Sequence, residues 1–260
     1  MNILGTPKEK KQAMSKLSVN LNAVAMLRNR RDIGWPSVTG IAKLVLEAGA
    51  NGITVHPRPD QRHIRQSDIG ELAKMLREDF PKAEYNIEGY PHERFLQLVE
   101  EAKPDQVTFV PDDPGQATSD HGWDIANNQE LLEKAIARMK NAGFRVALFI
   151  DAEPEIARMA AGVKADRVEL YTGPFAASFG SEQGDKHLLE LEKTAKAANA
   201  VGLGLNAGHD LTLENLPSFI KMMPNLLEVS IGHGITADAL VMGFPEAVRR
   251  HKALMGSRNI

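Results

Sequence analysis

A histidine closes an apolar run at residue 56 and leads into a loop stiffened by proline. Residues 52–63 read Gly-Ile-Thr-Val-His-Pro-Arg-Pro-Asp-Gln-Arg-His. The His56 side chain titrates near neutral pH, and the guanidinium forks of Arg58 and Arg62 match the oxygens of a phosphate. We therefore predict a proton-transfer residue beside an anion-binding turn that ends at His63. The alternative is structural: His56 ends a strand, and the arginines pair with Asp60 or a helix end.

Two glutamates stand at the ends of other apolar runs. Glu88 lies in Tyr-Asn-Ile-Glu-Gly-Tyr-Pro, and Glu169 lies in Arg-Val-Glu-Leu-Tyr-Thr-Gly. If these runs are strands that end in a shared cavity, burial raises the pKa of the two carboxyl groups toward the range useful for proton transfer. We favour this role for Glu88 over a structural ion pair with Arg58 or another cation. For Glu169 both interpretations stay open.

Two glycine-containing segments near the C-terminus could bind phosphate. Residues 204–210 read Gly-Leu-Asn-Ala-Gly-His-Asp, and residues 229–238 read Val-Ser-Ile-Gly-His-Gly-Ile-Thr-Ala-Asp. Glycines let a backbone approach an anion, and the N–H groups that begin a helix attract it. Thr236 is the expected N-cap of that helix. We predict phosphate binding at Gly232 and His233; ordinary tight turns are the alternative.

Several kinds of chemistry are missing from the sequence. It has no cysteine, which excludes disulfides, thiolate nucleophiles and cysteine-ligated metals. Lys16 precedes the first predicted strand and no lysine follows a strand, so a Schiff-base lysine is not expected. A looser metal site stays open as an alternative to our expectation of no metal and no cofactor. Its ligands would be His56, Glu88, Glu169 and His209.

The composition points to small-molecule partners. Among 260 residues, 31 Lys and Arg stand against 34 Asp and Glu, for a net charge of −3. A nucleic-acid reader would show a basic stripe, and no apolar stretch approaches the ~20 residues of a membrane span. The N-terminus is polar and lysine-rich, unlike a secretory signal. We therefore expect no nucleic acid and no membrane partner, and a cytoplasmic location.

Hydrophobic periodicity predicts eight alternations of strand and helix. The predicted strands span residues 17–22, 52–56, 85–88, 106–110, 145–150, 167–171, 204–206 and 227–231. The predicted helices span residues 36–50, 67–79, 92–102, 128–141, 154–161, 186–201, 213–222 and 236–255. Eight rounds without a linker favour an α/β fold, a (β/α)8 TIM barrel, over an open sheet. We expect a single domain over residues 16–260 after a flexible extension, residues 1–15.

The barrel would bring the chemical residues to one rim, because residues that follow the strands share the C-terminal face. Two long loops on that face, residues 57–66 and 111–127, are typical of lids or binding loops. The predicted rim consists of Asn20, Asn22, His56, Arg58, Glu88, Thr118, Asp151, Glu169, Thr172, Asn206, His209, Asp210, Gly232, His233 and Gly234.

These motifs resemble the pyridoxine 5'-phosphate synthase family, the ring-closing enzymes of deoxyxylulose-dependent vitamin B6 biosynthesis. The matching segments are Val19-Asn20, Leu27-Arg28-Asn29, Gly52-Ile-Thr-Val-His56-x-Arg58, Arg62-His63-Ile64, Asn86-Ile-Glu88, Val110-Pro111, Phe149-Ile-Asp151-Ala, Asn206-Ala-Gly-His209 and Ile231-Gly232-His233. They run in order from residue 17 to the end of the chain. The likeness therefore covers the whole predicted domain.

The resemblance implies a TIM barrel with extra helices that forms a homo-oligomer. It would condense 3-amino-2-oxopropyl phosphate with 1-deoxy-D-xylulose 5-phosphate into pyridoxine 5'-phosphate, phosphate and water. The substrate amine forms the imine, so acid-base groups replace a catalytic lysine. Carried over by position, the proton-transfer residues are His56, Glu88 and His209. The aminoketone phosphate would be held by Asn20, Arg31, Gly232 and His233, and the deoxyxylulose phosphate by Arg58, His63 and Thr118.

Two segments depart from the family pattern. Better-known members carry Asp-His where this chain has Asn22-Ala23, and Gly where it has Asp210. Both departures fall among expected substrate contacts, so Asn22 and Asp210 join the predicted substrate-binding residues. One hypothesis is that Asp210 restores the carboxylate that position 22 lacks.

Two other functions remain as alternatives. One is a metal-dependent epimerase or aldolase that acts on sugar phosphates, which would lose activity with EDTA. The other is an inactive barrel kept for ligand binding or assembly, because a fold alone does not fix a function.

Overall fold

The computed structural model describes residues 14–31, 33–112 and 119–256, which form a closed barrel of parallel strands. The order around the barrel follows the sequence, and β8 pairs with β1. The strands are β1 (Lys16–Asn20), β2 (Gly52–Val55), β3 (Glu84–Gly89), β4 (Gln106–Phe109), β5 (Arg145–Ile150), β6 (Arg167–Leu170), β7 (Gly204–His209) and β8 (Leu226–Ile231). The predicted (β/α)8 TIM barrel is confirmed.

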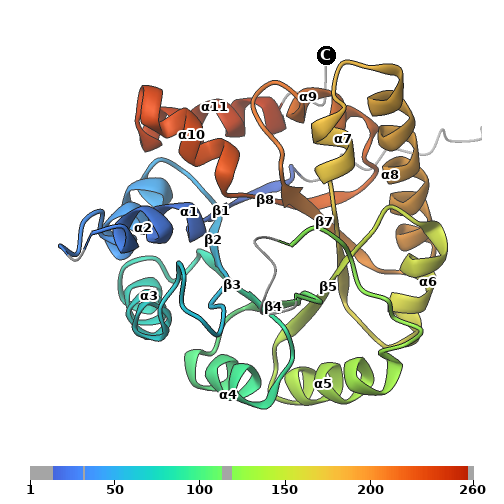
Figure 1. Cartoon of the computed structure of the whole chain (residues 1–260), viewed down its shortest axis with the longest axis horizontal. Helices are drawn as coiled ribbons and strands as arrows, with labels where there is room; N and C mark the ends of the chain where they lie inside the picture. The colour runs from blue at the N-terminus through green and yellow to red at the C-terminus, as the bar shows by residue number, and fades with distance from the viewer. Residues whose placement is uncertain (1–13, 32, 113–118, 257–260) are drawn as a thin grey trace, which may run out of the picture.

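Helices surround the barrel in a ring (Figure 1). They are α1 (Asn22–Asn29), α2 (Val38–Glu47), α3 (Gln66–Asp79), α4 (Glu93–Ala102), α5 (Gln129–Asn141), α6 (Pro154–Gly162), α7 (Gly173–Ala177), α8 (Glu182–Ala200), α9 (Leu216–Met222), α10 (His233–Met242) and α11 (Phe244–Gly256). Their apolar faces pack on the strands in one continuous core. Within the described ranges, no helix is both long and apolar enough to cross a bilayer.

Three of the wrongly predicted boundaries bear on the site or on the number of helices. The first strand ends at Asn20 instead of residue 22, because the Asn20 Oδ1 accepts the backbone N–H of Asn22 at 2.9 Å and α1 begins there. The seventh strand continues to His209, so Asn206 lies inside the barrel and not on the rim. The predicted last helix is two helices, α10 and α11, separated by Gly243 in the left-handed region at φ +80°.

The inside of the barrel is polar, which the apolar appearance of the strands concealed. Ser18, Thr54, Asn86 and Thr108 project inward as a middle layer and hydrogen-bond one another at 2.7–3.4 Å. Below them, toward the strand N-termini, lies a charged layer that we call the floor. It consists of Lys16, Glu84, Arg145, Arg167 and Glu228.

Lys16 begins β1 and reaches Glu84 at 3.1 Å, at the strand N-termini, as its position in the sequence predicted. Within the predicted N-terminal extension, residues 1–13 lie outside the described ranges. Ser15 is buried, and its hydroxyl donates to the Leu226 carbonyl at 2.7 Å. Among the described residues, Ser15 therefore already contacts the barrel, although it falls in the predicted extension.

Candidate active site

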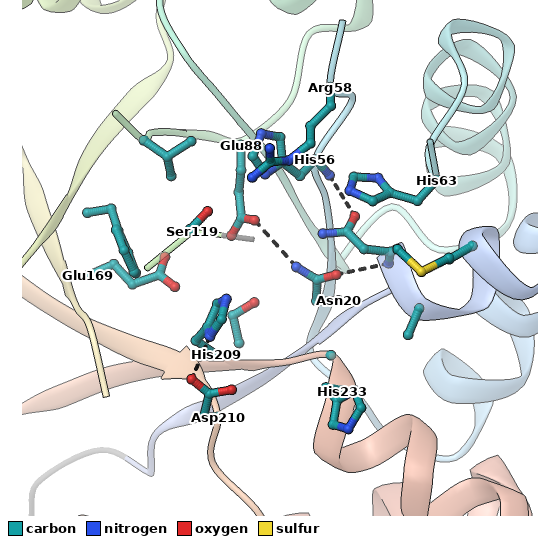
Figure 2. A pocket seen from close by; sticks show the side chains of 17 residues that line it. Asn20, His56, Arg58, His63, Glu88, Ser119, Glu169, His209, Asp210 and His233 are labelled. Atoms are coloured by element: carbon teal, nitrogen blue, oxygen red, sulfur yellow. Dashed lines mark hydrogen bonds and ion pairs between the residues drawn. The ribbon is translucent and has the colours of Figure 1, made fainter. Parts of the chain in front are cut away.

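A cavity of about 430 Å³ opens at the C-terminal ends of the strands, and we call its walls the mouth. Figure 2 shows the labelled side chains converging on this space from several strands. Of the twelve predicted site residues, ten line it: Asn20, Asn22, His56, Arg58, His63, Glu88, His209, Asp210, Gly232 and His233. Arg31 is exposed at the end of α1 and does not line the cavity, and Thr118 lies outside the described residues.

Two asparagines where β1 ends and α1 begins contact the catalytic candidates His56 and Glu88. The Asn22 Oδ1 accepts the backbone N–H of His56 at 2.9 Å, which fixes the chain where β2 ends. The Asn20 amide donates to Glu88 Oε2 at 3.4 Å (Figure 2). The start of α1 therefore positions both a histidine and a glutamate.

His56 is held as a neutral imidazole. Burial lowers its pKa well below the ordinary value, and the positive charge of Arg58 and the neighbouring His63 lower it further. The rings of His56 and His63 lie 6.0 Å apart. A neutral imidazole can accept a proton at neutral pH, so His56 is suited to act as a base.

Asp112 is a mouth-side residue that the sequence reasoning missed. Its Oδ2 accepts hydrogen bonds from Arg58 and from the Ser119 hydroxyl, the latter at 2.8 Å, and lies 3.7 Å from His56 Nε2. Arg58 is therefore paired with Asp112. The signal was available in the sequence, since Asp112 follows a strand by three residues.

The turn that carries His63 is fastened by the Leu27-Arg28-Asn29 motif. Arg28 is buried and contacts Asp68 at 2.5 and 3.0 Å and the His63 carbonyl at 3.1 Å. The Asn29 amide also donates to the His63 carbonyl, at 2.7 Å. The motif therefore stabilises the anion-binding turn from outside the cavity.

His63 is a neutral hydrogen-bond donor toward the cavity. Burial lowers its pKa to about 4, helped by Arg58 and Arg62. The His63 Nδ1 accepts the backbone N–H of Ile64 at 2.9 Å, so the remaining proton belongs on Nε2. Arg62 has the structural role that the sequence offered as the alternative, because its side chain pairs with Asp60 at 2.7 Å.

The two glutamates of the mouth are buried carboxyl groups that form no ion pair within the described residues. Burial raises the pKa of Glu88 well above its ordinary value, and the charges of Glu169, Asp112 and Glu228 raise it further. Burial also raises the pKa of Glu169, to about 7, although His209 lowers it. The Glu169 Oε2 has no hydrogen-bond partner in the described part of the chain. The pKa of both groups is therefore raised, the direction that the sequence predicted for Glu88.

His209 ends β7 in an unusual backbone conformation. Its φ of +59° lies in the left-handed region, which is strained for residues other than glycine and recurs at functional sites. The preceding Gly208 has no room for a side chain, since a Cβ there would lie 1.8 Å from the Ser230 carbonyl oxygen. The His209 Nδ1 contacts Asp210 Oδ2 at 2.7 Å. The histidine is thus fixed from both its backbone and its ring.

The predicted phosphate site coincides with the start of α10. Gly232 is the N-cap and His233 is the first helical residue, so the helix begins three residues before the predicted Thr236. Thr236 is inside the helix, and its hydroxyl is buried without a partner in the described residues. A Cβ at Gly232 would lie 3.1 Å from the Asn20 side chain, which explains why glycine stands there. The N–H groups of this first turn can attract an anion.

Other predicted rim residues have structural roles. The Thr172 hydroxyl donates to the Gly208 carbonyl, and Asn206 accepts from Arg167 at 3.1 Å. The cavity also contacts Phe149 and Ser230, which sequence reasoning did not select because apolar and hydroxyl side chains in strands carry no distinctive signal. In the described ranges, no three His, Asp or Glu side chains are grouped to hold a metal ion.

Comparisons with known proteins converge on one family. The family described as Pyridoxal phosphate biosynthesis protein PdxJ matches residues 17–257 of this chain. Pyridoxine 5'-phosphate synthase of Brucella anthropi is 57% identical over 242 residues, covering 93% of this chain and 99% of that protein. The synthases of Chelativorans sp. and Rhizobium meliloti are 58% and 55% identical, over 91% and 93% of this chain and 96% and 98% of theirs.

Solved structures with low identity share the barrel. The tryptophan synthase alpha chain of Legionella pneumophila aligns with a TM-score of 0.62 at 14% identity, covering 94% of each chain. The YdjI aldolase of Escherichia coli K12 aligns with a TM-score of 0.61 at 12% identity, covering 95% of this chain and 93% of that one. At such identities the likeness is one of fold alone.

Proposed function

The chain belongs to the PdxJ family of pyridoxal phosphate biosynthesis proteins, which confirms the resemblance, and we propose that it makes pyridoxine 5'-phosphate. Its substrates would be 3-amino-2-oxopropyl phosphate and 1-deoxy-D-xylulose 5-phosphate, and its other products phosphate and water. The 57% identity over almost the full length of a named synthase supports this assignment.

One observation in the cavity carries the proposal. Groups suited to bind anions stand on two sides of the mouth, with acid-base groups between them. Arg58 and the neutral donor His63 form one side, and the first turn of α10 with Asn20 forms the other. Two phosphorylated substrates fit this arrangement, because each phosphate has its own site while the reacting carbons meet between them.

The protonation states suggest which residues accept protons and which donate them. The amine of one substrate condenses with the ketone of the other, so no protein amine is required. Neutral His56 is suited to remove a proton from carbon, and protonated Glu88 is suited to give a proton to a departing hydroxyl. His209 lies opposite them as a second proton donor. Arg31 and Thr118 keep their proposed phosphate contacts.

The test is a product assay on the purified chain. Both substrates are supplied, and phosphate release is followed together with the absorbance of pyridoxine 5'-phosphate. We expect the two signals to appear in equal amounts and to persist in EDTA. Loss of activity in EDTA with recovery on adding a divalent ion would support the epimerase or aldolase instead, and no turnover would support an inactive barrel.

Assembly, domain organisation and location complete the proposal. Residues 16–260 would act as one domain, supported by the single closed barrel. A homo-oligomer is supported by apolar side chains left exposed, including Trp35, Leu240 and Val241, at 69%, 77% and 87% exposure. Light scattering would detect a monomer if this is wrong. A biosynthetic family supports work in the cytoplasm, which cell fractionation checks.

A further inference from the structure

An acidic side chain, Asp210, contacts a ring nitrogen of the catalytic candidate His209, and it stands at a position that departs from the family pattern. Its Oδ2 lies 2.7 Å from His209 Nδ1 (Figure 2). We propose that Asp210 is a positioning residue that orients His209 and keeps it charged as the proton donor of the reaction. This inference rests on the proposed function for the role of His209, but its physical core can be measured without turnover.

The contact fixes which ring atom meets the substrate. A carboxylate accepts the Nδ1–H, so Nε2 is the nitrogen left to face the cavity. The ring is also held by aromatic neighbours, with Tyr171 at 5.8 Å in an edge-on arrangement and Phe149 at 6.3 Å. With its backbone at φ +59°, His209 has little freedom to choose another orientation. Asp210 supplies the polar part of this restraint.

The charged groups around His209 come from several elements. Burial by itself lowers the pKa of His209, but the hydrogen bond and charge of Asp210 raise it above the ordinary value, and Glu169 on β6 and Asp112 after β4 add to this. His56 after β2 is the facing basic group, and its pKa is lowered in part by His209. Burial raises the pKa of Asp210, yet His209 and His233 lower it below its usual range.

Two of the histidines that line the mouth, His56 and His209, are thereby set to opposite tasks. Burial and Arg58 lower the pKa of His56, although Asp112 Oδ2 lies 3.7 Å from its Nε2, whereas the closer carboxylate of Asp210 raises the pKa of His209 and shifts it toward the imidazolium. A site with one base and one acid at the same pH needs such a difference. The sequence hypothesis that Asp210 replaces a carboxylate at position 22 stays a prediction. The structure gives Asn22 a different partner, the backbone of His56.

A titration of the histidine ring tests the positioning role directly. The ring resonance of His209, assigned with a His209→Gln variant, is followed against pH by NMR in the wild type, Asp210→Asn and Asp210→Glu. Removing an adjacent opposite charge should lower the midpoint by about one pH unit or more in Asp210→Asn. Asp210→Glu, which keeps the carboxylate, should stay near the wild type. An unchanged midpoint in Asp210→Asn would overturn the proposal, whether or not the protein is a synthase.

Kinetics separate positioning from direct substrate binding. In Asp210→Asn we expect kcat to fall about tenfold and its alkaline limb to move to lower pH by about one unit, with KM nearly unchanged. Asp210→Glu should recover most of kcat. A raised KM with an unmoved limb would show that Asp210 binds substrate instead. Asp210→Gly, the family residue, should behave as Asp210→Asn does, provided circular dichroism shows an intact fold.

Discussion

The mouth and the floor of this barrel bury the same type of residue in opposite electrostatic settings. Glu84 and Glu88 are four residues apart on β3 and both project into the barrel. On the floor, Glu84 contacts Arg145, Lys16 and, at 3.9 Å, Arg167. At the mouth, Glu88 accepts a hydrogen bond from the Asn20 amide at 3.4 Å, and it forms no ion pair within the described residues.

The difference separates stability from chemistry within one strand. The Glu84 carboxylate holds strands together through its contacts with several cations, whereas a buried carboxyl group without a cation favours its protonated form and can donate the proton. Between the two lies the uncharged layer of Ser18, Thr54, Asn86 and Thr108. The comparison teaches that cation contacts, more than burial, distinguish the candidate catalytic glutamate.

The largest expected effect is on turnover at the mouth. Glu88→Gln removes the transferable proton while preserving shape, so kcat should fall by about 100-fold or more with the melting temperature nearly unchanged. Steady-state kinetics and calorimetry measure both quantities. Glu100→Gln on the outer surface, where the carboxylate pairs with Arg138 at 2.8 Å, is the matched control and should keep full activity. Near-normal turnover in Glu88→Gln would remove that residue from the mechanism.

A substitution in the floor should lower the stability of the fold and leave turnover nearly unchanged. Glu84→Gln leaves Arg145 and Lys16 without their shared carboxylate, which should lower the free energy of unfolding by about 2 kcal/mol. For a chain of this size the melting temperature should drop by roughly 4–8 °C. Turnover per folded molecule should stay within about twofold of the wild type. A loss of kcat comparable with that of Glu88→Gln would break the distinction between the two regions.

The smallest effect concerns how stability depends on pH. The pKa of Glu169 is about 7 in the folded state and ordinary when unfolded, so the folded state holds a proton that the unfolded state has lost between about pH 4.5 and 7. Stability from this group therefore falls as pH rises through that window. Glu169→Gln should raise the free energy of unfolding at pH 8 by about 1 kcal/mol or more, and change it little at pH 4. A destabilised Glu169→Gln at pH 8 would contradict the assignment of an unpaired carboxyl group.

Much of the architecture could be predicted because it depends on periodicity. Apolar runs located every strand, and the shared rim of a barrel brought ten predicted residues to one cavity. Periodicity could not reveal α7, whose five residues are too short for a pattern, or the end of β1, which an Asn20 side chain decides. Asn206 was misplaced because a strand that contains two glycines ends where its pairing ends, not where its apolar residues do.

The sequence could not predict which charged side chains pair with one another, for a different reason. Whether a glutamate is paired depends on residues far along the chain: Arg145 meets Glu84 across 61 positions, and Asp112 meets Arg58 across 54. The contact between His209 and Asp210 is local, but its meaning depends on the left-handed backbone at His209, which no neighbouring residue type announces. The sequence therefore predicted which side chains are reactive, but not which partners contact them.

The most direct test of the account is whether Glu88 holds a proton at neutral pH. Infrared spectra of the wild type and of Glu88→Gln at pH 7 are subtracted in the region of the protonated carboxyl C=O stretch. Because burial and the charge of Glu169 raise the pKa of Glu88 well above its usual value, we predict a protonated-carboxyl band that the substitution removes. Arg138 lowers the pKa of Glu100, so the control substitution Glu100→Gln should leave that region unchanged. A difference spectrum showing loss of an ionised carboxylate instead would contradict the central claim.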